Sequence, residues 1–385
     1  MLIFRRVVAI FLFVFIAIPL LLAPVYRFPP PQPFAGSALW NPYAHLSGTW
    51  QKTNLHAHGV AWAGVTNGKQ SDQEVVAAYK ARGYSVAGVS NYGSIAAFAG
   101  VDTIPLYEHG YNIPKGHQLA IGARSVVWLD FPLWQTLDQK QYIIDRVGAD
   151  AALVSINHPN TAYVDEDMRN LTGYQLMEIV NGPFPVFDLW DTALSCGHVV
   201  WALANDDAHD VTNLRRTFIA WNMIDAPSPS ATDIIGALRA GRSYAVSLVG
   251  NNPDAALKSI EVSDATVTIT STGVPATYLF VGQSGVVRGT ANQVMQATYT
   301  FAATDTYIRT VIRTPNMVMY VNPIMRYDGI ALPSPTRAIN DTMTWLQRAL
   351  VVVVSAVVMF VLWRRAPTFG RRASDRSQQR NTIGR

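Results

Sequence analysis

The chain has 385 residues, 49% of them hydrophobic and only 15% charged, and this length suits two domains plus terminal segments. The formal net charge of +4 belongs to the ends of the chain, because residues 1–6 and 364–385 hold nine of the 30 basic residues and one of the 26 acidic ones. The central region is therefore acidic, which argues against a nucleic-acid partner. The single cysteine, Cys196, excludes a scaffold stapled by disulfides.

Each end of the chain contains an apolar run without charge. Residues 7–23 follow Arg5 and Arg6, and residues 349–363 precede a second arginine pair that begins at Arg364. Basic residues that flank a membrane span tend to stay in the cytoplasm. Both ends are therefore expected to be cytoplasmic, with the central domains on the extracytoplasmic side of the cytoplasmic (inner) membrane.

The predicted segments at the ends are a transmembrane anchor at residues 1–24, a second transmembrane helix at 344–363 and a basic tail at 364–385 beside the lipid bilayer. Two alternatives apply here. The first run also fits a cleaved signal peptide, and the second run also fits a buried core helix.

A proline-rich linker at residues 25–45 leads into a region, residues 46–248, in which strands and helices alternate. Strands are predicted at 50–55, 84–90, 117–123, 152–156, 174–180, 199–204 and 218–223, and helices at 71–82, 133–147, 185–196 and 230–240. This alternation predicts an α/β fold with a parallel sheet, and the number of units favours a barrel over a small open sheet. Short alternating stretches at 249–335 predict an antiparallel β-sandwich.

Histidines and acids follow several of the predicted strands. His56 and His58 follow the first strand, His158 follows the strand at 152–156, and Asp207 and His209 follow the strand at 199–204. The carboxyl ends of barrel strands meet on one face, so these side chains are expected to converge there. Each motif alone is commonly structural. Together, at strand ends, they predict a site for Zn²⁺, Mn²⁺ or Fe²⁺, which imidazole and carboxylate groups bind.

The same motifs, taken in order, resemble the PHP (polymerase and histidinol phosphatase) family. The matching segments are residues 54–58, Glu108, the stretch HQLAIG at 117–122, residues 156–159 and the stretch NDDAHD at 205–210, and they cover roughly residues 50–248. The resemblance implies a distorted (β/α)₇ TIM-like barrel that binds two or three divalent metal ions and hydrolyses phosphate esters. It also implies that the metal ligands are His56, His58, Glu108, His117, His158, Asp207 and His209, with Glu108 and Asp207 acting in catalysis.

One family motif is missing. Members usually carry T-D-H-D after the second strand, where this chain has Ser90, Asn91, Tyr92 and Gly93, and residues 61–68 supply no strong ligand. We therefore expect a third metal to be lost or weakly held, and a two-metal core centred on Glu108. His109 is predicted either to act as a substitute ligand or catalytic acid, or to pack against the barrel rim.

Tyr92, Arg124 and Arg215 are candidate substrate-binding residues, since arginine forms bidentate contacts with phosphate. The alternative for both arginines is a solvated surface position. Two functions stay open at this point. One is a phosphoesterase that acts on a small-molecule or envelope phosphate ester, and the other is a degenerate domain that binds metal or ligand without turnover, as a scaffold or sensor.

Overall fold

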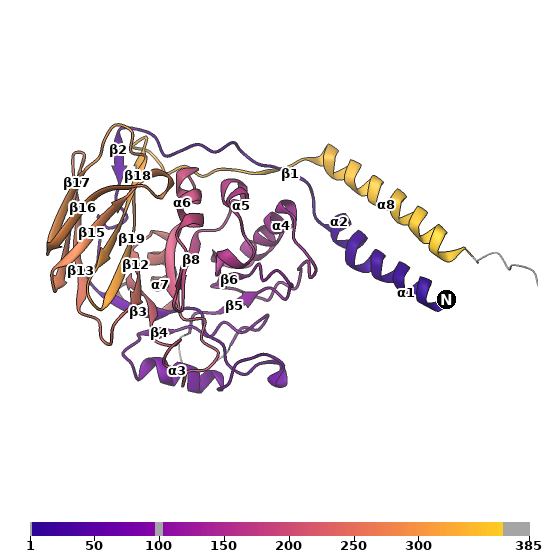
Figure 1. Cartoon of the computed structure of the whole chain (residues 1–385), viewed down its shortest axis with the longest axis horizontal. Coiled ribbons are helices and arrows are strands. Elements are labelled where there is room, and N and C mark those ends of the chain that lie inside the picture. Colours follow the sequence, from indigo (N-terminus) through magenta and orange to yellow (C-terminus); the bar gives the residue numbers. More distant parts are fainter. Residues whose placement is uncertain (1, 97–102, 365–385) are drawn as a thin grey trace, which may run out of the picture. The chain divides into compact units, whose positions relative to one another are not determined.

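A computed structural model describes residues 2–96 and 103–364 of the chain (Figure 1). The chain divides into two compact units, one formed by Ala23–Asp341 and the other by Met1–Leu22 together with Thr342–Arg385. The predicted basic tail lies outside the described residues apart from Arg364.

The terminal unit contains two apolar helices. The first consists of α1 (Leu2–Leu12), a π-helical turn (Phe13–Ala17) and α2 (Ile18–Leu22), and the second is α8 (Asp341–Trp363). The π-helical turn ends two residues before Pro19, whose ring cannot fit a regular α-helical ladder and which has no N–H to donate.

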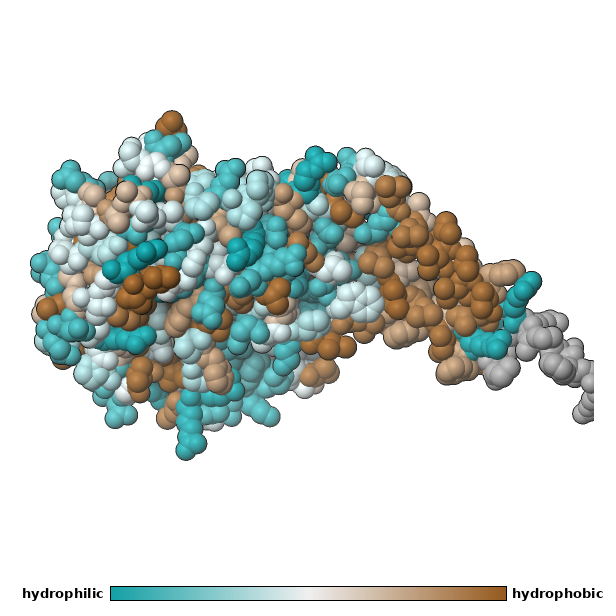
Figure 2. Space-filling view, turned by 45° about the horizontal axis from the view of Figure 1, so that its top comes forward, coloured by the Kyte–Doolittle hydropathy of each residue, from teal (hydrophilic) through white to brown (hydrophobic). Residues whose placement is uncertain are grey.

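Both helices are long and apolar enough to cross a membrane, by the criteria of length and composition, over Ile3–Leu22 and Asp341–Trp363. Their apolar side chains are largely uncovered, and Figure 2 shows them as a continuous brown surface. This arrangement is weak evidence of membrane association, because a signal sequence passes the same test for the first helix.

Four of the strands next to the predicted ligands, β5, β6, β7 and β10, belong to a six-stranded sheet in Ala23–Asp341. Its order is β10 (Trp201–Asn205), β8 (Leu176–Asn181), β7 (Leu153–Ile156), β6 (Gln118–Ile121) and β5 (Leu106–His109), with β9 (Phe184–Pro185) paired to β8. The pairs of β8 with β7 and β10 are parallel, whereas β6 is antiparallel to both of its neighbours. Only eight residues connect β5 to β6, too few for the crossover that a parallel pair requires. The expected all-parallel arrangement is therefore wrong at this point.

A nine-stranded sheet crosses the boundary that was predicted between residues 248 and 249. Its order is β16 (Val287–Val294), β15 (Ala276–Val281), β18 (Tyr307–Arg313), β19 (Met317–Tyr327), β12 (Ser243–Leu248), β11 (Ala220–Asp225), β3 (Trp50–Asn54) and β4 (Val86–Ala87), with β2 (Ala38–Trp40) paired to β19. The boundary lies inside one compact unit, because β12 pairs with β19 on one side and with β11 on the other.

Two smaller sheets complete this unit. A three-stranded sheet of β13 (Ala255–Ser263), β14 (Thr266–Gly273) and β17 (Gln296–Thr300) shares a buried apolar cluster with β15, β18 and β19, which gives the expected antiparallel sandwich. Figure 1 shows this sandwich at the end of the unit farthest from α4. β1 (Tyr26–Arg27) pairs with β20 (Ala338–Ile339).

The helices of this unit confirm the four that were predicted and add one. They are α3 (Asp72–Lys80), α4 (Leu137–Gly148), α5 (Asp165–Asn170), α6 (Asp188–Ser195) and α7 (Ala231–Arg239), with short 3₁₀ turns at Trp62–Gly64, Pro159–Thr161 and Gln283–Gly285. A second apolar cluster lies around β5–β8 and β10, and α4 packs on β6 and β7. The seven strands that were predicted from residue 50 to 223 all overlap observed strands.

No ladder closes the six-stranded sheet and the β3–β4 edge into a barrel within the described part of the chain, so the closed barrel expected from the sequence is not observed. Single bridges span the two gaps, one between Tyr92 and Glu108 and one between Ala57 and Ala208. β4 ends at Ala87 and pairs only with β3 among the described strands, and the bridge to β5 lies further along the chain at Tyr92.

On the edge of β10 that faces away from β8, side-chain amides take the hydrogen-bonding place of a neighbouring strand. Asn222 accepts a hydrogen bond from Ala204 N at 2.8 Å and donates one to Ala204 O at 2.7 Å, and Asn322 Oδ1 accepts from Ala202 N at 2.8 Å. The fold is thus a mixed α/β structure of several sheets, whose strand ends still meet at the two bridges.

Candidate metal centre

The seven candidate ligands lie on segments that the two bridges bring together. His56 and His58 follow β3, and Asp207 follows β10; these two segments are joined by hydrogen bonds from Asp207 N to His56 O at 3.0 Å and from His58 N to Ala208 O at 2.8 Å. Glu108 lies on β5, and its N–H donates to Ser90 O at 3.2 Å. Main-chain hydrogen bonds therefore fix the backbone positions from which these side chains extend.

The first ligand set consists of His56, His58, Glu108 and Asp207. Nε2 of His56 lies 3.3 Å from Glu108 Oε2 and 3.2 Å from Asp207 Oδ1. Nε2 of His58 lies 3.2 Å from the same two oxygens. His209 extends this set, because its Nε2 lies 3.3 Å from Asp207 Oδ1.

The second ligand set uses the other oxygen of Glu108. Oε1 of Glu108 lies 3.0 Å from His117 Nδ1 and 3.1 Å from His158 Nε2, and all three residues are buried. His117 immediately precedes β6, and His158 follows β7. Each oxygen of the Glu108 carboxylate thus faces a different group of ligand atoms.

The first set has the spacing and the unused atoms that a metal ion requires. His56 Nε2, both nitrogens of His58, Glu108 Oε2 and Asp207 Oδ1 are buried without a hydrogen-bond partner among the described residues. Four ligands about 2.0–2.1 Å from a tetrahedral ion lie about 3.3 Å from one another. The observed separations of 3.2–3.3 Å match this value, so the residues fit a divalent ion.

Electrostatics at the cluster follow from burying imidazoles against carboxylates. Burial lowers the pKa of His56, but the charges of Asp207, Glu108 and Glu178 outweigh it and leave that pKa well above its ordinary value. The pKa values of His58 and His158 are raised in the same way. Burial alone would raise the pKa values of Glu108 and Asp207, yet the neighbouring histidines hold both well below the usual range. Without an ion, the cluster attracts protons instead.

Two candidate ligands have strained backbones. His158 has φ 27° and Asp207 has φ 49°, in a region that residues other than glycine seldom occupy. Such conformations cost on the order of 1–3 kcal/mol each and gather at functional sites, because the surrounding structure must hold them. The His158 loop is held by a hydrogen bond from its own N–H to Glu178 Oε2 at 2.9 Å.

Glu178 is a buried member of the site that sequence reasoning missed. Its Oε1 accepts from His56 Nδ1 at 2.9 Å and from Asn205 Nδ2 at 3.1 Å, and its Oε2 accepts from His158 N and Asn181 Nδ2, each at 2.9 Å. The donor proton on His56 Nδ1 leaves the Nε2 lone pair free to face a metal. The sequence signal was a glutamate inside a predicted strand of apolar residues.

Asp206 was also missed, although it directly precedes Asp207. Its carboxylate accepts hydrogen bonds from Tyr79 Oη and Phe218 N, each at 2.7 Å, and from the N–H groups of Ile219 and Ala220 at 3.0 and 2.9 Å. Burial raises the pKa of Asp206 to about 6. The two neighbouring aspartates thus face different environments, one the loop before β11 and the other the ligand cluster.

Tyr92 occupies the position at which the resemblance implies a histidine. Its ring stacks on His58 with centroids 4.6 Å apart, and it lies edge-on to His117 at 5.6 Å. Burial, followed by the charges of Glu108 and Asp207, raises the pKa of Tyr92, so its hydroxyl stays protonated beside those carboxylates.

Three other predicted residues lie outside the cluster. Both nitrogens of His109 are already hydrogen-bonded, Nδ1 to Gln118 Oε1 at 2.9 Å and Nε2 to Leu129 O at 2.8 Å. Arg124 follows the far end of β6 and pairs with Asp150 at 3.5 Å. Arg215 is exposed in the loop after His209. His109 is therefore packed among its hydrogen-bond partners, and both arginines occupy solvated surface positions, which are the alternatives given for these residues from the sequence.

Comparison with known proteins gives one solved structure to report. It is a two-domain protein from Bacteroides vulgatus ATCC 8482, described as containing a predicted PHP-like metal-dependent phosphoesterase. The similarity has a TM-score of 0.42 and 14% sequence identity, and it covers 80% of this chain and 98% of that one. No protein-family model and no curated protein matches the chain.

Proposed function

We propose that the chain is a metal-dependent hydrolase that cleaves a phosphate ester. The observation that carries this proposal is Glu108, whose two oxygens face two groups of ligand atoms, with His56, His58 and Asp207 on one side and His117 and His158 on the other. Two divalent ions held by such a carboxylate, Zn, Mn or Fe, would activate water and stabilise charge on a phosphoryl group.

The protein side chains supply position and proton control. Glu178 fixes the tautomer of His56 and holds the His158 loop, so the ligand nitrogens point at Glu108 before anything binds. Asp207 and Glu108 are the proposed catalytic carboxylates, since both reach the first ligand set. Arg215, an exposed side chain in the loop after His209, is the proposed phosphate contact, whereas Arg124 lies at the other end of β6.

The proposed location is the outer face of the cytoplasmic membrane, with the lipid bilayer as a partner of the two terminal helices. Two apolar helices with largely uncovered side chains support it, and arginines lie at the charged end of each run. The substrate would then be a small-molecule or envelope phosphate ester, and no nucleic-acid partner is proposed.

A second candidate is a domain that binds metal or ligand without turnover, as a scaffold or sensor. Tyr92 favours it, because a phenol stacked on His58 cannot offer the ligand that an imidazole would at that position.

The test measures bound metal and hydrolysis on the same sample of the full-length chain. Elemental analysis of protein loaded with Zn²⁺ or Mn²⁺ should give about two equivalents, and p-nitrophenyl phosphate or its bis ester should be hydrolysed. His56→Ala and Asp207→Ala should abolish both, whereas His45→Ala, at an exposed histidine outside the cluster, should change neither. Metal without turnover on any ester would favour the second candidate, and no metal at all would refute the hydrolase and the metal-binding form of the second candidate.

A further inference from the structure

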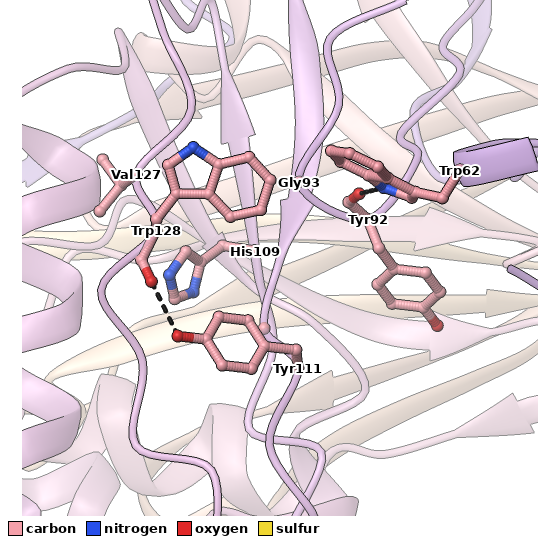
Figure 3. Close-up of a pocket in the computed structure, with 8 residues that line it drawn as sticks. Trp62, Tyr92, Gly93, His109, Tyr111, Val127 and Trp128 are labelled. Atoms are coloured by element: carbon pink, nitrogen blue, oxygen red, sulfur yellow. Dashed lines mark hydrogen bonds between the residues drawn. The ribbon is translucent and has the colours of Figure 1, made fainter. Parts of the chain in front are cut away.

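A cavity of about 380 Å³ adjoins the candidate metal centre (Figure 3). It is lined mainly by aromatic side chains from four segments of the chain: Trp62, Tyr92, Gly93, His109, Gly110, Tyr111, Val127 and Trp128. None of these residues belongs to the seven candidate ligands, although Tyr92 and His109 were among the other candidate site residues.

The wall of the cavity is shared with the metal ligands. Tyr92 lines the cavity and also stacks on His58. Gly110 lies against His117 so closely that a Cβ at this glycine would be 2.4 Å from His117 Cδ2. The cavity and the ligand cluster therefore lie on opposite sides of Tyr92 and Gly110, within reach of a single ester.

Three of the polar side chains of the lining, those of Trp62, Tyr111 and His109, are already hydrogen-bonded. Trp62 Nε1 donates to Tyr92 O at 2.7 Å, and Tyr111 Oη donates to Trp128 O at 2.8 Å. Both nitrogens of His109 have partners as described above. A sugar or nucleobase would thus bury hydroxyls or amides with few groups to pair with them, and each buried group left unpaired weakens binding. An apolar group carries no such cost.

The two tryptophans that border the cavity pack against each other, and Trp128 also packs against Gly93. Their rings meet edge to face, with centroids 5.6 Å apart, and Figure 3 shows them on either side of Gly93. Trp62 and Ala63 both have φ 53°, a strained conformation for residues with side chains. At Gly93, with φ 55°, a Cβ would lie 3.1 Å from Trp128 Cζ3, so the close approach of this indole requires glycine.

We infer that this cavity binds the organic group of the substrate and selects phosphate monoesters of apolar, ring-bearing alcohols over sugar phosphates. The inference rests on the proposed hydrolase function. In the reaction the P–O bond to the alcohol breaks, water supplies the new oxygen on phosphorus, and a water proton goes to the departing oxygen. The products are an apolar alcohol in the cavity and inorganic phosphate. Flat rings suit the site because offset or edge-on contacts with indole and phenol rings add to the gain from burial.

The test compares 1-naphthyl phosphate with glucose 6-phosphate on the metal-loaded full-length chain in lipid nanodiscs. We expect kcat/KM to favour the naphthyl ester by about 10-fold or more, the range that apolar contacts provide. Trp128→Ala and Trp62→Ala should each lower this preference by about 10-fold, mainly through KM. Trp134→Ala is the matched control, since Trp134 is exposed on the segment that follows Trp128 but does not line the cavity.

Binding of 1-naphthol, measured by calorimetry without metal, separates this inference from the hydrolase proposal. Binding that Trp128→Ala or Trp62→Ala weakens and Trp134→Ala does not would support the cavity assignment even if no ester were hydrolysed, in which case only the hydrolase proposal fails. Equal kcat/KM for the two esters would overturn the inference. So would a preference that both cavity variants retain, or the absence of naphthol binding to wild-type protein.

Discussion

Replacing Glu178 by glutamine is the most informative single change at the candidate metal centre. The carboxylate of Glu178 accepts four hydrogen bonds, two at each oxygen: His56 Nδ1 and Asn205 Nδ2 donate to Oε1, and His158 N and Asn181 Nδ2 donate to Oε2. Only a group with acceptors on both sides satisfies all four donors. Glu178→Gln keeps the size of the side chain and turns one acceptor into a donor.

Both orientations of the new amide disturb a ligand. If its NH₂ faces His56, the Nδ1 of that ring must become an acceptor, which moves the proton to Nε2 and removes the lone pair that faces Glu108 and Asp207. If the NH₂ faces His158 instead, it meets the backbone N–H that anchors a strained loop. Partners of metal-bound histidines typically contribute 10–100-fold in metal affinity. We therefore expect Zn²⁺ to bind Glu178→Gln about 10–100-fold more weakly, or about 1.4–2.7 kcal/mol.

The assay is competition for Zn²⁺ against a chromophoric chelator at pH 7.5, with wild-type protein and two variants side by side. Glu261→Gln makes the same chemical change at an exposed position on β13 and should bind like wild type. Thermal unfolding of the metal-free proteins shows whether both variants are folded. A Glu178→Gln affinity within twofold of wild type, in folded protein, would refute the assignment of the His56 tautomer to this carboxylate.

Three further predictions concern stability, each measured by unfolding of the metal-free full-length chain. Arg309→Met should cost about 3–5 kcal/mol, because it leaves buried Asp191 without the bidentate partner whose nitrogens lie 2.7 and 2.6 Å away, and adding Asp191→Leu should recover most of the loss. Asp206→Asn should cost about 1–3 kcal/mol through lost acceptors on the loop before β11, in contrast to Asp207→Asn, whose main effect should be on metal binding. Burial lowers the pKa of His198 in the folded state, so the unfolded chain binds that proton more readily. The stability linked to this residue is present above its ordinary pKa of 6.5 and is lost as the pH falls from there toward the lowered value. Between pH 7.5 and 5.5 the unfolding free energy of His198→Gln should therefore fall by less, or rise by more, than that of wild type. An equal pH dependence of the unfolding free energy in both proteins would contradict the prediction for His198.

The local elements of the fold could be predicted because their signals lie within a few residues of one another. Ser71 and Glu74 form the expected capping box, with Glu74 Oε2 accepting from Ser71 N at 2.7 Å, and α3 starts at the next residue. The ligand motifs were equally local, since each lies directly after or before a strand. Their convergence followed from one general rule, that strand ends meet at one edge of a sheet.

The remainder depends on pairing between distant segments, which leaves no local pattern. In the sequence, only the short connection before β6 distinguishes this antiparallel strand from the parallel one that was expected. The nine-stranded sheet joins β12 to β19 across about 70 residues, so a change of pattern near residue 249 resembled a domain boundary. Glu178 reads as an ordinary strand residue until the segments that donate to it are placed around it.

The histidines and carboxylates of the ligand cluster depend on one another electrostatically. Histidines and carboxylates packed at 3.0–3.3 Å would repel or hold protons unless a cation lies between them, which is why the pKa of His56 is raised and that of Glu108 is lowered. Metal binding must displace those protons, so the same charges that favour the ion also couple its affinity to pH. Glu108 belongs to both ligand sets, and loss of its charge would leave each set with one carboxylate or none. The strained backbones of His158 and Asp207 are consistent with a site whose geometry is set by surrounding pairing rather than by local preference.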